Sequence, residues 1–149
     1  MGNLEADDED RRRYQLEIIG ALEEAVRLNP FKAEYHILLG WRYVYLWKDP
    51  DYHTRWLPAA DISMERVAYF AGEKSPYLHV HLGNYWVVRS KTINPAHPDW
   101  ESAWTKAIWH YKKNLSIESG QERKKMKQKI KHYIWNFYPD EELVHQAVE

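Results

Sequence analysis

The side chains of this sequence that could perform acid–base or metal chemistry are its eight histidines and its 22 aspartates and glutamates. His79 and His81 could bind one metal ion from a strand, but on a helix they point about 200° apart. Glu141 and Glu142 precede His145 at helical spacing, a combination that arises by chance in a chain this charged. No G-x-S-x-G, phosphate-loop or H-E-x-x-H pattern occurs. The sequence therefore predicts a non-enzymatic protein with no catalytic residues, no metal site and no cofactor.

The bulk composition narrows the possible partners. The 149 residues include no cysteine, which excludes disulfides and a cysteine nucleophile. No apolar run approaches the roughly 20 residues of a membrane-spanning helix, and a pI of about 6.7 does not favour nucleic acid. We expect no nucleic-acid partner and no membrane span in this chain. Its localisation stays open between the cytoplasm and the soluble part of a membrane-associated protein.

The spacing of apolar and helix-breaking residues predicts an all-α chain. Residues 1–12 are predicted to be a disordered charged tail and residues 13–149 a single domain. The stretch KDPDYHTRWLP, residues 48–58, contains two prolines and is predicted to break any helix. Asp99 is a possible N-cap and Pro76 a first-turn residue. Helices are expected over residues 14–29, 32–47, 60–71, 76–90, 99–116 and 121–137, with a short closing helix after Pro139.

Two aromatic stretches repeat, YHILLGWRYVY at residues 35–45 and LHVHLGNYWVV at residues 78–88. Each has a His, a Leu-Gly pair three residues later, and an aromatic residue three positions after the glycine. The helices that come before, between and after these stretches share a second signature at steps of four, three and five residues. Its three copies are Ile18-Leu22-Ala25-Pro30, Met64-Ala68-Ala71-Pro76 and Ala107-Tyr111-Asn114-Ser119. A period of this size indicates stacked helix pairs.

This pattern resembles the tetratricopeptide repeat (TPR), which has W-x2-L-G-x2-Y on its first helix and A-x3-F and a proline on its second. The resemblance covers about residues 14–137. It departs from the family in the longer period, in the absence of Leu-Gly from residues 121–137, and in His36 and His79, which replace Trp and are expected to be hydrogen-bonded core residues. It implies a short α-solenoid of about three helix pairs, six helices plus a short C-terminal capping helix. Gly40 and Gly83 would then lie at close helix contacts, facing the small side chains of Ala25 and of Ala68 or Ala71.

The resemblance also implies a concave groove that binds a protein or peptide segment. The groove positions carry over to Glu34, Ile37, Trp41, Val44, Tyr77, Val80, Asn84 and Val87. The family's carboxylate-gripping pattern needs Lys and Asn where this chain has Ile37 and Trp41, so an apolar or extended segment, or another subunit, fits better. The alternative is that these residues pack on one another or on the last helix.

Two further surfaces are candidates. Lys127 and Lys131 lie one helical turn apart in the basic run of residues 122–132 and could contact an anion, or could simply face solvent. Trp residues flank the long loops and could stack on a glycan or pin the loops to the fold. They are Trp47, Trp56, Trp100 and Trp104.

A narrower resemblance suggests a setting for the chain. Its aromatic-rich repeats and the stretch IWNFYPDEEL, residues 134–143, look like the TPR-type soluble regions of bacterial O-antigen ligase and polymerase-like proteins. The expected function is a non-catalytic protein- or peptide-binding module, possible as an accessory domain of a surface-polysaccharide system. The alternatives are a self-association domain forming a homodimer, and a glycan-binding module.

Overall fold

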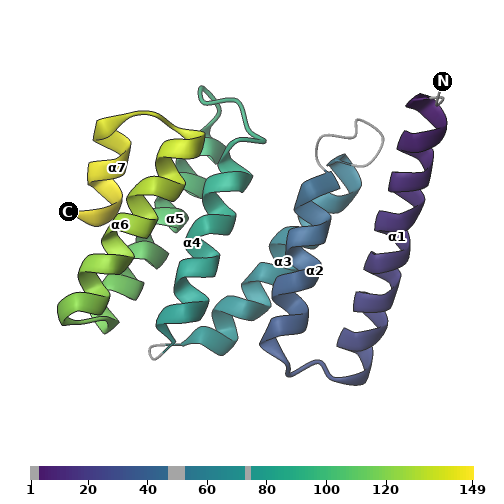
Figure 1. Cartoon of the computed structure of the whole chain (residues 1–149), viewed down its shortest axis with the longest axis horizontal. Coiled ribbons are helices and arrows are strands. Elements are labelled where there is room, and N and C mark those ends of the chain that lie inside the picture. Colours follow the sequence, from purple (N-terminus) through teal and green to yellow (C-terminus); the bar gives the residue numbers. More distant parts are fainter. Residues whose placement is uncertain (1–3, 47–52, 73–74) are drawn as a thin grey trace. The chain divides into compact units, whose positions relative to one another are not determined.

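A computed structural model describes residues 4–46, 53–72 and 75–149, with side chains from residue 8 onward and, after the first gap, from residue 56. In this part of the chain all regular structure is helical, which confirms the all-α prediction (Figure 1). The helices are α1 (Leu4–Leu28), α2 (Ala33–Tyr45), α3 (His53–Ala71), α4 (Pro76–Ser90), α5 (Pro98–Ile117), α6 (Gly120–Phe137) and α7 (Glu141–Val148). The chain divides into two compact units, Met1–Arg66 and Val67–Glu149, and the single domain expected over residues 13–149 stays a prediction.

Helix α1 begins earlier than the sequence analysis expected. It starts at Leu4, so residues 4–12, part of the tail predicted to be disordered, are helical in the structure. Ile19, with 1% of its surface exposed, is the buried residue of α1, and Arg42 of α2 donates a 3.3 Å hydrogen bond to Gln15. The helix ends before Pro30, as predicted, because proline at this point cannot continue it.

Helix α3 also begins earlier than expected, at His53, so residues 53–58 are helical although they were assigned to a helix-breaking stretch. Pro58 lies inside this helix, where it removes one backbone hydrogen bond. Packing offsets that loss: the Trp56 ring stacks on Tyr43 of α2 at a centroid distance of 5.2 Å, and Leu57 is 6% exposed. The tertiary contacts of this turn therefore override its poor local helix propensity.

Gly40 and Gly83 lie at close helix contacts, but their neighbours are large side chains. A Cβ on Gly40 would stand 2.8 Å from Cε of Met64 in α3, and one on Gly83 would stand 2.5 Å from Cε1 of Tyr111 in α5. The expectation that they face Ala25, Ala68 or Ala71 was wrong. In both repeats the glycine makes room for a bulky residue of the following helix, and that residue belongs to the second-helix signature.

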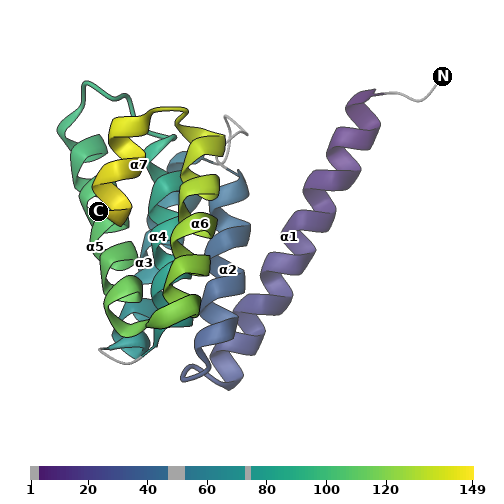
Figure 2. The same cartoon turned by 60° about the vertical axis from the view of Figure 1, so that its left-hand side comes forward.

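The second unit is built around α4 and α5, which pack along each other over most of their length. Helix α7 lies against both α5 and α6 (Figure 2). Helix α4 begins as predicted with Pro76 in its first turn, after Ser75, whose hydroxyl accepts a hydrogen bond from the Leu78 amide. The N-cap of α5 is His97 and not Asp99, because the His97 ring accepts a hydrogen bond from the Asp99 amide.

Candidate functional site

The predicted groove residues of α2 divide between the core and the surface. Ile37 is 5% exposed and Val44 is fully buried, so neither can contact a partner in this conformation. Glu34 is exposed and forms a 3.8 Å ion pair with Lys32, and Trp41 is half-buried. Of these four positions, Glu34 and Trp41 are the ones that a partner could reach.

The open face of α2 is an aromatic strip that the sequence analysis identified only in part. Leu38 and Tyr45 are 51% and 60% exposed, and they lie three residues before and four after Trp41, on one side of the helix. The Trp41 and Tyr45 rings stack at 5.6 Å with an angle of 27°. We call Leu38, Trp41 and Tyr45 the α2 strip. Their spacing was visible in the sequence, but most residues of α2 are apolar or aromatic, and the repeat pattern assigned Ile37 and Val44 to the groove as well.

On α4 the predicted residues have different environments. Tyr77 is 58% exposed and meets the His81 ring edge-on at 4.6 Å. Val80 is half-buried and Val87 is fully buried. Asn84 is half-buried, and its side-chain oxygen accepts a 2.7 Å hydrogen bond from the Tyr111 hydroxyl, so its amide is fixed by α5. Tyr77, Val80 and part of Asn84 therefore remain accessible on this helix.

The two repeat histidines are core residues, as predicted. His36 and His79 are each 1% exposed. Their Nε2 atoms donate to the carbonyl oxygens of Pro30 and Gly72, at 2.7 and 2.8 Å, in the connection before each helix. Both therefore carry a proton on Nε2, and each ring ties the preceding turn to its helix.

His79 also belongs to a buried histidine pair that the sequence analysis missed. Its Nδ1 lies 3.0 Å from Nδ1 of His110, which is 7% exposed. Burial, with a smaller contribution from the nearby His79 and Lys106, lowers the pKa of His110 to about 4. At this distance one of the two Nδ1 atoms donates to the other. The pair joins α4 to α5 and has too little exposed surface to act on a substrate.

The basic residues of α6 adjoin two shallow pockets. Lys127 and Lys131 are both half-buried. Lys131 lines pockets of about 300 and 320 Å³ between α6 and α7, together with Trp135, which is 47% exposed, and Val144. Sequence reasoning found the lysines and missed Trp135, although it stands one turn after Lys131. This surface combines positive charge with an exposed indole.

The Trp residues that flank the long loops mostly contact other helices. Trp56 pins α3 to α2, as described above, and Trp47 lies outside the described residues. The Trp100 indole donates a 3.0 Å hydrogen bond to the Tyr138 hydroxyl, and the Trp104 indole donates a 2.9 Å hydrogen bond to the side-chain oxygen of Gln146 in α7. Trp56 and Trp104 therefore join helix to helix, and Trp100 joins α5 to the connection after α6. The alternative that Trp residues pin the long loops stays a prediction.

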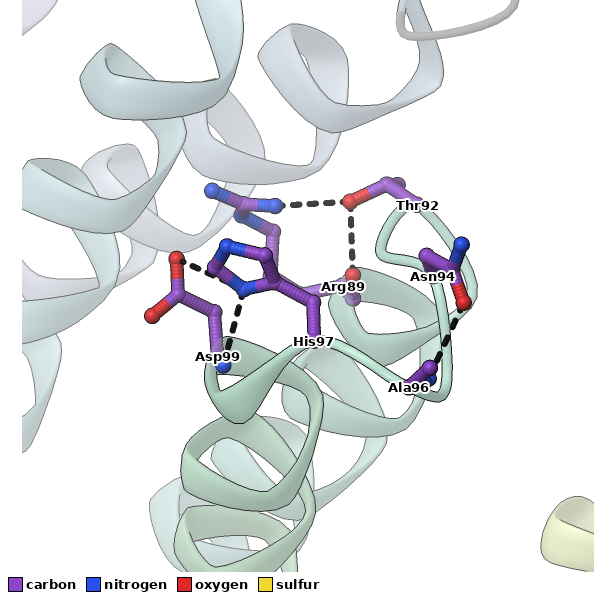
Figure 3. A network of polar contacts seen from close by, with 6 residues as sticks. All are labelled: Arg89, Thr92, Asn94, Ala96, His97 and Asp99. Carbon is purple, nitrogen blue, oxygen red and sulfur yellow. Dashed lines mark hydrogen bonds and ion pairs between the residues drawn. The ribbon is translucent and has the colours of Figure 1, made fainter.

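A pocket of about 510 Å³ lies beside Trp100 and Trp104, with residues 95–98 of the α4–α5 connection in its wall. Short polar contacts fix this connection (Figure 3). Arg89 donates to the Thr92 hydroxyl at 2.6 Å, the Ala96 amide donates to Asn94 at 2.9 Å, and His97 caps α5. The pocket wall is thus held in place by its own backbone and side chains.

Neither a cluster of metal ligands nor a membrane-spanning helix is found among the residues described. Among them no group of three or more His, Asp or Glu side chains could hold a metal ion. No helix in the described ranges is long and apolar enough to cross a bilayer. No family model, no curated protein and no solved structure matches the chain.

Proposed function

We propose that this protein is a non-catalytic interaction module, a short TPR-like α-solenoid that binds a protein or peptide segment through the α2 strip. The observation that carries the proposal is the exposure of Leu38 and Tyr45 on either side of Trp41 on one helix face. Trp and Tyr are the residues most often responsible for binding energy at protein interfaces. A partner with apolar or aromatic side chains at helical or extended spacing would cover this strip.

Glu34 defines a further part of the partner's chemistry. It lies one turn before Leu38 and places a carboxylate at the end of the strip. A segment that carries two apolar anchors and a basic residue would satisfy both kinds of group.

Glycan binding is the weaker candidate. The 510 Å³ pocket contains two indoles, but Trp104 is only 4% exposed and both indole N–H groups are already used within the protein. A sugar needs an open ring face and free hydrogen-bonding groups. The role as accessory domain of a bacterial surface-polysaccharide system is proposed on the narrower sequence resemblance alone.

The test is a selection of peptides from a displayed library on the immobilised chain, followed by titration of a selected peptide. Trp41→Ala should weaken its binding by at least about tenfold. Tyr69→Ala is the matched control, because Tyr69 is 84% exposed on another helix and should leave binding unchanged. If no peptide is selected, or if the two variants bind alike, the α2 strip is not a peptide site. A dimer of the wild type that Trp41→Ala dissociates would favour self-association through this strip instead.

A further inference from the structure

Helix α1 carries a second apolar stripe that faces away from the core. Tyr14, Ile18, Ala21, Ala25 and Leu28 follow one another at steps of four, three, four and three residues, which places them on one side of the helix. Tyr14 and Leu28 are 63% and 70% exposed, Ala21 is exposed, and Ile18 and Ala25 are half-buried. We call these five residues the α1 stripe.

The repeat shows that this stripe is a helix-packing face. The alignment that matches Ile18 with Met64 and Ala107 places the first four stripe positions in the core of the other two second-type helices. The equivalent residues are Ala60, Met64, Val67 and Ala71 in α3, and Ala103, Ala107, His110 and Asn114 in α5. All eight are at most 7% exposed. In α5 the helix that contacts this face is α4, through the His79–His110 pair and through the Asn114 amide, which donates to the Pro76 carbonyl at 2.7 Å.

Helix α6 has a face that no following helix covers completely. It follows α5 in the order of a first-type helix, yet the helix after it, α7, has eight residues where α3 and α5 have 19 and 20. Part of α6 is therefore left open, and the two pockets around Lys131, Trp135 and Val144 mark that surface. Its exposed indole and pockets suit large apolar side chains such as Leu28.

Helices α1 and α6 also have opposite net charges. Helix α1 has eight acidic and four basic residues, whereas α6 has six basic and one acidic. Opposite net charges speed the encounter of two surfaces and disfavour the pairing of like ones, here α1 with α1 or α6 with α6.

We propose that copies of this chain associate head to tail, with the α1 stripe of one copy docked on the open α6–α7 face of the next. Such a contact is heterologous, so a dimer keeps one free face of each kind and can add further copies. It uses neither Trp41 nor Tyr45, and it stands or falls separately from the α2 strip.

Sedimentation velocity over a wide concentration range tests the association on the full chain. One variant, Ala21→Arg with Leu28→Arg, destroys the α1 stripe; a second, Lys131→Glu with Trp135→Ala, destroys the α6 face. Each alone should raise the dissociation constant by at least about tenfold. An equimolar mixture should form a dimer and nothing longer, because each variant keeps one intact face. Trp41→Ala should associate like the wild type.

Site-directed crosslinking gives an independent readout, since the chain has no cysteine. Ala21→Cys and Gln128→Cys, on two separately purified chains, should form a disulfide-linked heterodimer under mild oxidation more readily than either forms a homodimer. Circular dichroism checks that the variants fold, and the positions substituted on the α1 stripe and the α6 face are exposed or lie at the surface pockets. A wild type that stays monomeric, association that survives loss of the α1 stripe, or a mixture that fails to pair would each overturn the proposal.

Discussion

Acid should weaken this fold through His110. The residue is 7% exposed, lies 3.0 Å from His79, and has a pKa lowered from 6.5 to about 4, first by burial and then by His79 and Lys106. On unfolding, its ring returns to water and regains its ordinary pKa. The unfolded chain then binds a proton more readily than the folded one, so acid favours unfolding.

The size of the effect follows from the two pKa values. The contribution of neutral His110 is fully present above pH 6.5 and is lost as the pH falls from 6.5 towards about 4. A difference of about 2.5 pKa units corresponds to a limit of about 3 kcal/mol, of which about 2 kcal/mol is lost between roughly pH 7 and pH 5. That loss is a large fraction of the stability of a domain of this size.

Urea unfolding of the wild type and of His110→Asn at pH 7 and pH 5 measures this loss of unfolding free energy. The Asn side chain can still form a hydrogen bond with His79 but cannot titrate, so the variant should lose about 2 kcal/mol less than the wild type over this pH interval. His145→Asn is the control, because His145 is exposed on α7, and it should behave like the wild type. If the losses of His110→Asn and the wild type are equal, His110 is not held neutral by the fold and the reasoning is wrong.

The remaining predictions concern stability at neutral pH, measured by urea unfolding. Gly83→Ala should cost about 1–3 kcal/mol, because its Cβ would overlap the buried Tyr111 ring. Gly40→Ala should cost less, since its contact is the flexible end of a methionine. Gly20→Ala should instead stabilise the chain by about 0.5–1 kcal/mol, because nothing lies within 4 Å of the added carbon and alanine favours a helix. Tyr138→Phe should cost about 1–2 kcal/mol through loss of the hydrogen bonds to Ser90 and Trp100. Equal effects of the three glycine substitutions would contradict this order.

The sequence predicted the helices and the close glycine contacts because these depend on local patterns. Apolar spacing marked the helices, and Gly40 and Gly83 are costly in a helix unless packing requires them. The residue that fills the space beside each glycine could not be read in the same way. Met64 and Tyr111 are brought there by the packing of a separate helix, which no local pattern records.

The start of α3 shows the same limit. Two prolines and an Asp-Pro step predict a loop, and at Pro58 this prediction was wrong. The helix persists because Trp56 stacks on Tyr43, a residue 13 positions away in the sequence. A contact between two helices therefore decides the structure of a turn whose own residues disfavour it.

The exposed face of α2 was predicted only in part because most residues of the helix are apolar or aromatic, with Glu34 and Arg42 as its charged residues. Ile37 and Leu38 are neighbours, and they point about 100° apart on a helix. One is 5% exposed and the other 51%. Hydrophobic periodicity assigns a face only when the opposite face is polar, so the rotation of α2 is set by its neighbours.

The two repeats should differ in their sensitivity to acid, because only the second one contains His110. His36 and His79 bind the preceding carbonyl in the same way, but only the second repeat has His110 at the position where the first has Val67. Protonation of His110 would place a charge inside the α4–α5 contact. Protection against hydrogen exchange, measured relative to the intrinsic rate at each pH, should therefore fall in α4 and α5 before α1 and α2 as the pH is lowered, and His110→Asn should reduce that difference. A uniform loss of protection across the chain would mean that another group titrates.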